Sequence, residues 1–337
     1  MKIRNLKQSS SEHLLLNIDC WSLISYFLFL IFRKGGYMFK RKDGMSRALV
    51  KRETIAGYLF MAPSLLFFLM FVIYPMFMCI YTSFFDSTMG RAEDIFIGFK
   101  NYIELFQDKI FLGALRNTLV IVLVSVPITC LFSLWVASAI YDMKGWACSL
   151  FRCVFYLPVV TGSVAVTVVW KWMFNNYYGI FNYLLKNMGI IDKNINWLGD
   201  PQYALGCIIL ILLTTSVGQP IVLYVSALSN VDQSLIEAAE VDGATRNQCF
   251  WRIKIPQIMP TTLYILVITT INSFQCFALI QLLTSGGPNH STDTIMYYIY
   301  YTAFKLYRYG YGNAMGVILM IIIALLSAVQ FKFAQTK

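Results

Sequence analysis

Six long stretches of the chain contain no Asp, Glu, Lys or Arg, and they dominate its hydropathy pattern. These stretches are residues 54–85, 117–141, 153–170, 201–231, 255–292 and 309–331. Each is long enough to cross the bilayer hydrocarbon as a helix, which takes about 20 apolar residues. The stretches are continuously apolar rather than alternating, so they exclude a transmembrane β-barrel. The pattern predicts six spanning helices, at about 55–81, 116–140, 150–173, 204–228, 259–283 and 311–332.

The Lys and Arg residues between these stretches indicate which side of the membrane each loop occupies. If the segment before the first predicted helix is cytoplasmic, the inside segments carry thirteen Lys and Arg and the outside loops carry seven. Positively charged loops are retained on the cytoplasmic side. Both ends of the six-helix core are therefore expected to be cytoplasmic. The loop between the fourth and fifth helices then faces the cytoplasm, and the loop between the third and fourth faces outward.

A further apolar stretch, residues 14–32, precedes the core and contains Asp19. Positive charge flanks it on both sides, so the positive-inside rule gives it no clear orientation. The DNA that encodes Lys-Gly-Gly-Tyr, directly before Met38, could contain a ribosome-binding sequence. We therefore expect residues 1–37 to be a mis-assigned start and 38–53 to be a basic cytoplasmic segment, ahead of a spanning domain at 54–333. The alternative is a real additional N-terminal helix.

Composition agrees with a membrane protein. Hydrophobic residues make up 58% of the chain and charged residues 13%, whereas about a quarter of a soluble domain is charged. The net charge of +10 does not indicate nucleic-acid binding, because the charges punctuate apolar stretches instead of forming a basic domain. The eight cysteines include no C-x-x-C pair, and buried thiols are expected. The two histidines lie far apart in sequence, which argues against a zinc enzyme.

Prolines interrupt several of the predicted spans. They are Pro63, Pro75, Pro127, Pro158 and Pro220. Each removes an amide donor and can kink its helix, although membrane helices also tolerate proline without functional consequence. Pro220 differs because Gly218 and Gln219 precede it. A Gly-Gln-Pro break at mid-membrane depth can open backbone groups towards a cavity, as in discontinuous transporter helices.

The cytoplasmic loop between the fourth and fifth helices carries signals for two short helices. Ser234 with Glu237 fits a capping box, and so does Thr245 with Gln248. Gly243 stands between them, where a left-handed helix end favours glycine. The sequence predicts two short helices joined by a sharp turn, with Pro256 ending the second. The first helix carries a small-residue patch suited to a partner's groove; the alternative is an ordinary amphipathic connector.

The same loop contains a long motif. It consists of Glu237, Ala238 and Ala239, then Gly243, then Ile253, Ile255 and Pro256. It resembles the E-A-A, Gly, I-x-L-P signature of permeases of binding-protein-dependent ABC importers, and its single departure is Ile255 in place of Leu. The resemblance covers roughly residues 54–333 and is closest to the maltose-type and multiple-sugar branch, in particular to the first of its two non-identical permeases. Supporting stretches are 58–63, 156–158, 197–201, 277–288 and 300–304.

The resemblance implies an all-α, multi-pass plasma-membrane protein with a six-helix core and a cytoplasmic coupling loop. It also implies the partners: a second permease subunit forming a heterodimer, two copies of an ABC ATPase subunit, and an extracellular sugar-binding protein. The two short helices would dock into the ATPase. The chain has no Gly-Lys dipeptide, which a phosphate-binding loop requires. We therefore expect no enzymatic site and no cofactor in this chain, with ATP-Mg bound by the partner ATPase.

The resemblance also suggests a sugar path on the helices that flank the coupling loop. In maltose-type relatives, polar positions on these helices contact the sugar. The matching positions are Thr214, Gly218, Ile221, Thr269, Ser273 and Cys276, with Gln219, Asn272 and Gln275 beside them. Relatives often carry Asn or an aromatic residue at three of these positions, which leaves open both the sugar and whether this subunit holds it. The alternative for each Ser or Thr is a hydrogen bond to its own helix.

Other classes of protein fit less well. Half of a secondary transporter would need ionisable groups in mid-span to couple ions, and the charge-free stretches contain none. A membrane-embedded enzyme would need a catalytic cluster, but the sequence has no H-E-x-x-H motif and no histidine in a predicted span. Within the family, an importer of another small solute remains the alternative to a sugar importer.

Overall fold

The computed structural model describes residues 47–88, 90, 94–143 and 145–335, and these are mainly helical. The apolar stretch 14–32 and the expected start at Met38 lie outside the described residues. The chain divides into two compact units. One comprises Met1–Ile103 and Thr302–Ala324, and the other comprises Glu104–Tyr301 and Leu325–Lys337.

The first unit contains the first predicted span. Its elements are α2 (Arg47–Phe68), the π-helical turn η1 (Leu69–Ile73), α3 (Tyr74–Thr82), β1 (Phe85–Asp86), β2 (Ile95–Phe96), η3 (Tyr301–Lys305) and the first part of α17 (Tyr309–Gln335). The two short strands pair antiparallel, with Phe85 opposite Phe96. The amide Nδ2 of Asn313 donates to Thr82 Oγ1 over 2.6 Å, and this bond joins α17 to α3.

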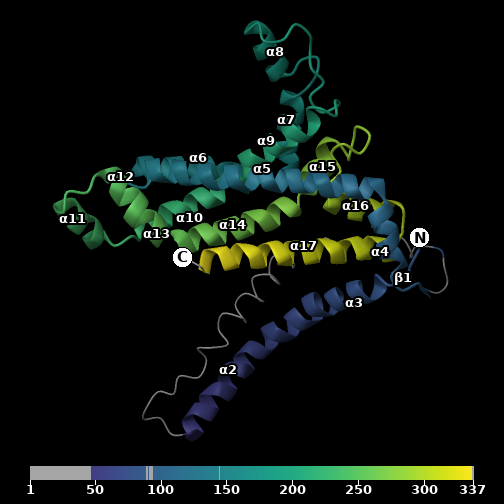
Figure 1. The fold of residues 1–337 in the computed structure, drawn as a ribbon, viewed down its shortest axis with the longest axis horizontal. Coiled ribbons are helices and arrows are strands. Elements are labelled where there is room, and N and C mark those ends of the chain that lie inside the picture. The colour runs from purple at the N-terminus through teal and green to yellow at the C-terminus, as the bar shows by residue number, and fades with distance from the viewer. Residues whose placement is uncertain (1–46, 89, 91–93, 144, 336–337) are drawn as a thin grey trace. The chain divides into compact units, whose positions relative to one another are not determined.

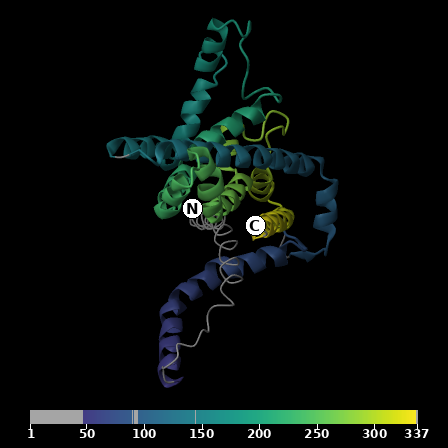
Figure 2. The same ribbon diagram turned by 60° about the vertical axis from the view of Figure 1, so that its left-hand side comes forward.

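The second unit is a helical bundle built around a long helix. Its elements are α4 (Lys100–Gln107), α5 (Lys109–Ile140), α6 (Trp146–Val160), α7 (Ser163–Met173), α8 (Ile180–Asn187), α9 (Ala204–Ser216), α10 (Gly218–Ser229), α11 (Gln233–Val241), α12 (Arg246–Cys249), the π-helical turn η2 (Phe250–Lys254), α13 (Ile255–Gln257), α14 (Met259–Phe274), α15 (Ala278–Leu283) and α16 (Ile295–Tyr300). Helix α5 packs against α9, α10, α14 and α16, and it runs the length of the bundle in both ribbon views (Figures 1 and 2). α4 begins in the first unit and ends in the second.

Among the described residues, four helices are long and apolar enough to cross a membrane, and they match predicted spans. They are Tyr58–Thr82, Lys109–Ile140, Met259–Leu283 and Tyr309–Lys332. Two helix pairs account for the remaining predicted spans: α9 and α10 are bent by 41°, and α6 and α7 by 93°. The described part of the chain therefore has up to six spans if each bent pair counts as one. The third predicted span, 150–173, consists of two helices, because Thr161 and Gly162 separate α6 from α7.

Two of the prolines follow π-helical turns. Pro75 lies two residues after η1, and Pro256 lies two residues after η2. A proline lacks the amide that would bond the carbonyl four residues earlier, and its ring crowds that carbonyl. A widened turn in front of the proline relieves the crowding while the helix continues. Pro127, by contrast, lies inside the unbroken helix α5.

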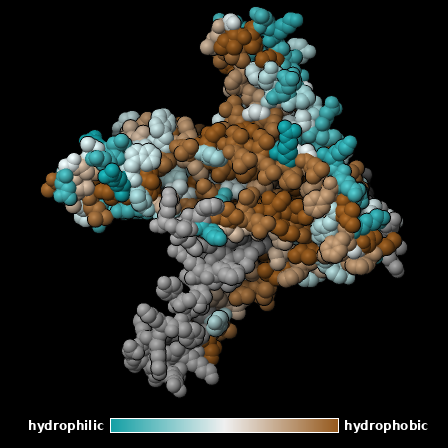
Figure 3. Space-filling view, viewed as in Figure 1, coloured by the Kyte–Doolittle hydropathy of each residue, from teal (hydrophilic) through white to brown (hydrophobic). Residues whose placement is uncertain are grey.

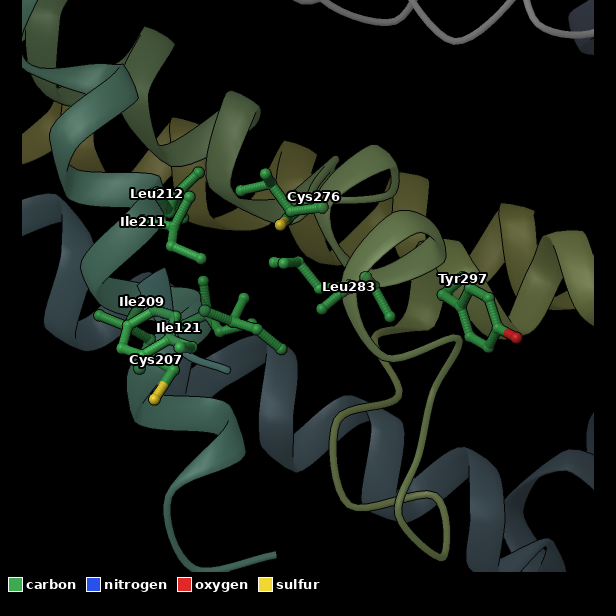
Figure 4. Close-up of a cluster of buried hydrophobic side chains, with 12 residues drawn as sticks. Ile121, Cys207, Ile209, Ile211, Leu212, Cys276, Leu283 and Tyr297 are labelled. Atoms are coloured by element: carbon green, nitrogen blue, oxygen red, sulfur yellow. The ribbon is translucent and has the colours of Figure 1, made fainter. Parts of the chain in front are cut away.

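The apolar core of the second unit lies where α5, α9 and α15 converge (Figure 4). Ile121, Ile208, Ile211 and Ile280 are fully buried there. The surface around this core is also apolar, and in the space-filling view hydrophilic side chains gather at α11–α12 and around α8 (Figure 3). An apolar surface over the middle of long helices, with hydrophilic ends, is what a bilayer requires.

Candidate coupling surface and substrate path

Helix α11 begins with an aspartate cap. Asp232 is the N-cap residue, and its carboxylate accepts a hydrogen bond from the Ser234 amide over 3.0 Å. The predicted capping box between Ser234 and Glu237 is therefore wrong. Asp and Ser cap equally well, and the helix starts at Gln233, which places Ser234 inside its first turn.

The end of α11 has the sharp turn that the sequence predicts. The Gly243 amide donates to the Glu240 carbonyl over 3.0 Å, and the Ala244 amide donates to the Ala239 carbonyl over 2.9 Å. These two bonds form a Schellman motif, which needs a left-handed residue just after the helix. Gly243 supplies it with φ of 82°. A Cβ at this position would meet nothing within 4 Å, so backbone conformation alone requires the glycine.

The second short helix, α12, has the predicted capping box. The Thr245 hydroxyl accepts from the Gln248 amide, while the Gln248 side chain accepts from the Thr245 amide over 2.8 Å. Pro256 does not end this helix, which corrects the prediction. The chain stays helical through η2 and α13, because the widened turn of η2 accommodates the proline without ending the helix.

The two short helices bury one face and expose another. Ile236, Cys249 and Ile258 are buried and anchor the segment. On the other side, Leu235, Val241 and Trp251 are exposed; Val241 is 89% and Trp251 is 59% accessible. The motif residues divide in the same way: Glu237, Ala238, Gly243 and Pro256 are exposed, whereas Ala239, Ile253 and Ile255 are half-buried. The segment therefore presents an apolar, small-residue surface suited to a protein partner. We call residues 232–257 the coupling surface.

A hydrogen bond ties the coupling surface to the central helix. Lys254 Nζ donates to the Tyr141 hydroxyl at the end of α5, and the same ammonium lies 4.6 Å from the centre of the Tyr141 ring. Burial raises the pKa of Tyr141, and the bond from Lys254 opposes that shift. Sequence reasoning missed this pair because the two residues are 113 positions apart and each looks like an ordinary loop residue.

The structure places most of the sugar-path candidates inside the bundle. Ile221 and Cys276 are buried among apolar side chains, and Thr269 is 5% exposed. Thr214 donates to the Ile211 carbonyl of its own helix over 2.7 Å, which is the ordinary alternative for a helical threonine. Ser273 is buried and lies 3.0 Å, hydroxyl to hydroxyl, from Ser125 on α5.

The remaining candidates differ in exposure. Gln219 on α10 and Asn272 on α14 are exposed, and Gln275 is half-buried. Gly218 packs closely against α6: a Cβ there would lie 2.4 Å from the Phe155 carbonyl oxygen. The glycine at the α9–α10 break therefore permits a close helix crossing. Helices α10 and α14 pack against each other, so the exposed amides lie on neighbouring helices.

A polar stripe on α5 faces this region, and sequence reasoning missed it. Thr118, Ser125, Thr129 and Ser133 are all buried, and their spacing places them on one face of the helix. Ser133 donates to the carbonyl of Val217 over 3.3 Å, at the break between α9 and α10. The recurrence of Ser and Thr at steps of four and seven in the stretch 117–141 was the signal that could have found the stripe.

At its other end, α5 holds the loop that follows α15. Asn117 Nδ2 donates to the carbonyls of Ser291 and Asp293, over 2.9 and 3.1 Å. The Asp293 carboxylate is 1% exposed and lies 2.6 Å from Nδ1 of His290, which is half-exposed. Burial raises the pKa of the Asp293 carboxyl, and the His290 contact opposes this shift. This loop lies at the end of α5 opposite the coupling surface.

These features were compared with known proteins. Residues 111–336 match the family described as the binding-protein-dependent transport system inner membrane component. The chain belongs to this family. The permease is 33% identical to the probable ABC transporter permease protein YurN of Bacillus subtilis, over 86% of this chain and 99% of that protein. It is 32% identical to the lactose transport system permease protein LacF of Rhizobium radiobacter, over 87% of this chain and 98% of that protein.

A solved structure agrees with this assignment. The permease resembles a chain of a bacterial ABC transporter involved in the import of the acidic polysaccharide alginate, with a TM-score of 0.71 and 25% identity. The match covers 85% of this chain and 97% of that chain. The protein is therefore a membrane-integral transport subunit with the predicted helical permease fold.

Proposed function

We propose that this permease imports a sugar or oligosaccharide, driven by ATP hydrolysis on a separate subunit. The observation that carries the proposal is the coupling surface: two capped helices and the turn η2, which together expose Leu235, Val241 and Trp251 on a chain of this family. A chain without a phosphate-binding loop needs an ATPase partner. The sugar assignment is supported by the motif resemblance, by the lactose permease LacF and by the alginate importer.

The proposal includes the partners. A second, non-identical permease completes the pore, two ATPase subunits bind ATP-Mg and receive the coupling surface, and an extracellular binding protein delivers the sugar. The family description itself names dependence on a binding protein. Glu237, Ala238, Ala239, Gly243, Ile253, Ile255 and Pro256 are the proposed coupling residues.

The proposed sugar path runs between α10 and α14. Gln219 and Asn272 are its best-exposed polar groups, and an amide facing an apolar solvent would be costly. The buried candidates Thr269 and Ser273 would act by shaping the wall. The other candidates, Thr214, Gly218, Ile221, Gln275 and Cys276, stay predictions of positions along the path.

Thermal stabilisation of the cognate binding protein tests the substrate. A ligand that binds only the folded protein raises its stability in proportion to RT ln(1 + [L]/Kd). A panel of neutral and acidic sugars, amino acids and phosphate esters is added to the purified binding protein. We expect stabilisation by sugars alone. Stabilisation by an amino acid or a phosphate ester instead would favour an importer of another solute.

Uptake by the reconstituted system tests the dependence on ATP. Vesicles containing this permease, its partners and the loaded binding protein should accumulate sugar only with internal ATP-Mg. A partner ATPase whose phosphate-binding lysine is replaced by alanine should abolish uptake, because that lysine contacts the β- and γ-phosphates. Uptake that persists with this variant, driven by an ion gradient, would indicate a secondary transporter.

A further inference from the structure

The segment between α7 and α9 carries two aromatic faces, and one of them takes part in packing. Phe174 stacks on Phe181 with ring centres 4.8 Å apart and on Trp170 at 5.5 Å, and Trp197 lies 6.1 Å from Phe174. All of these side chains belong to, or pack against, the apolar core of the second unit. Packing of this inner face against the core stabilises the folded segment.

A buried asparagine fixes the shape of the segment. Asn182 is 2% exposed. Its Nδ2 donates to the carbonyls of Asn176 and Ile195, over 3.1 and 3.0 Å, and its Oδ1 accepts from the Trp197 indole over 3.0 Å. Gly179 completes the turn, since a Cβ there would lie 2.3 Å from the Asn175 carbonyl oxygen. The segment is therefore held in one conformation before any ligand binds.

The outer face of the segment forms a pocket. Trp172, Tyr177, Tyr178 and Tyr183 are 55%, 84%, 65% and 65% exposed. With Lys186 and Asn194 they line a pocket of about 330 Å³. None of the four rings stacks on another ring within the described residues, unlike the rings of the inner face. Packing of the segment therefore does not account for four exposed aromatic side chains in one place.

The pocket lies apart from the coupling surface, on the segment that joins the third predicted span to the fourth. The inner face of its segment packs against α15, through core residues that include Leu279 and Leu283. α15 closes the fifth span at the end opposite α11–α13 (Figure 1). The charge bias places the coupling surface in the cytoplasm and the segment between the third and fourth spans on the other side of the membrane, so the pocket belongs to the outer side.

We propose that this pocket binds carbohydrate at the outer face of the permease, apart from the proposed path between α10 and α14. The inference rests on the proposed function. Aromatic rings offer flat apolar faces for the C–H side of a sugar ring, and the amide of Asn194, the ammonium of Lys186 and the tyrosine hydroxyls offer hydrogen bonds to sugar hydroxyls. The volume is at the lower end of ligand sites and suits one or two sugar rings.

The rival occupant is the lipid headgroup region, because Trp and Tyr also gather at membrane interfaces. Interfacial aromatic residues need only place their amphipathic rings at the level of the headgroups. Here the aromatic side chains surround a concave site that includes asparagine side chains. The hydrogen bonds of the buried Asn182 fix the backbone around this site. These observations favour a sugar over lipid.

Ligand-observed NMR tests the proposal on the full-length permease in nanodiscs together with its partner subunits and without the binding protein. The probes are lactose and an alginate trisaccharide, one neutral and one acidic. We expect saturable binding of at least one probe in the millimolar range. The variant Tyr177→Ala/Tyr183→Ala should weaken it at least about tenfold, which corresponds to about 1.4 kcal/mol. Tyr74→Ala, which removes another exposed tyrosine from a spanning helix, should leave it unchanged.

The outcomes are distinct. Absence of saturable binding of both probes, or equal binding by the double variant, would overturn the proposal. A double variant that binds sugar normally but requires different lipids for activity would identify the aromatic side chains as a lipid contact and would also overturn it. Sugar uptake by the complete system is measured in parallel. If uptake succeeds while the pocket proposal fails, the proposed function stands.

Discussion

At the scale of single residues, Gly243 has the clearest requirement. Its φ of 82° closes the Schellman motif, and its surroundings would accept a Cβ. We expect Gly243→Val to strain the turn by about 1–2 kcal/mol and to reduce uptake several-fold at normal membrane levels. Gly243→Asn should retain most uptake, because asparagine tolerates the left-handed region. Equal uptake by the Val and Asn variants would show that the turn does not matter for coupling.

Ala239 offers a second test of the coupling surface. It is half-buried beside the exposed Ala238, so a large side chain at this position would project from the helix. We expect Ala239→Trp to abolish stimulation of ATP hydrolysis by the loaded binding protein, because the ATPase could no longer approach the helix. Asn230→Trp, at an exposed position just before the coupling surface, is the matched control. Normal stimulation in Ala239→Trp would remove this helix from the proposed contact.

The buried Asp293 makes a prediction about pH. Burial raises the pKa of the Asp293 carboxyl in the folded protein above the ordinary value for an aspartate. At a pH between these two pKa values, the folded protein therefore binds more protons than the unfolded chain. Its contribution to stability is therefore present in acid and is lost as the pH rises through the folded-state pKa. We expect the thermal midpoint of the permease, relative to that of Asp293→Asn, to be higher at pH 4 than at pH 7. Asp192→Asn, which alters an exposed loop carboxylate, controls for general charge effects. A difference that does not change with pH would contradict the prediction.

At the scale of elements, the contact between α5 and the coupling surface is open to test. Lys254→Met removes the hydrogen bond to Tyr141, and we expect it to lower the amount of sugar transported per ATP hydrolysed by a few-fold. Movement of the coupling surface would no longer be passed fully to the central helix. Lys254→Arg should restore most of the ratio, and Arg246→Met, which removes a cation from the same loop, should leave it unchanged. A decline in uptake and ATP hydrolysis by the same factor would instead indicate a purely structural role.

Local signals in the sequence predicted the elements well. The length of the charge-free stretches alone predicts four spans, near 55–81, 116–140, 259–283 and 311–332. Local rules for helix ends predict the capping box at Thr245 and the turn at Gly243. The 93° bend between α6 and α7 did not follow, because Thr161 and Gly162 interrupt an apolar run without a charge. The N-cap at Asp232 was missed because Ser234, two residues later, is an equally good capping residue.

The candidate site was less predictable, since it depends on contacts between distant residues. Ser125 and Ser273 are 148 positions apart, and each alone looks like a serine bonded to its own helix. Ile221 and Cys276 were selected by alignment to a family pattern, yet both are buried in this chain. Only tertiary packing tells a wall residue from a core residue, and a single sequence does not contain that information.

At the scale of the whole molecule, the orientation can be tested by labelling. Val241 and Tyr177 are 89% and 84% exposed, one on the coupling surface and one in the outer pocket. Single cysteines are introduced at these positions in a cysteine-free background. We expect a membrane-impermeant maleimide added to intact cells to label Tyr177→Cys and to label Val241→Cys only after the membrane is opened. Labelling of both from outside would reverse the assignment of the coupling surface to the cytoplasm.

The sharp bend after α6 bears on how the chain enters the membrane during synthesis. α6 has 15 residues and is therefore only about 22 Å long, shorter than the roughly 30 Å of hydrocarbon. The first amides of α7 also lack a side-chain cap, which lipid cannot supply. The bent pair packs against α9, α10 and α15, which are synthesised later. We therefore expect its final placement in the membrane to follow the synthesis of segments more than a hundred residues further along the chain.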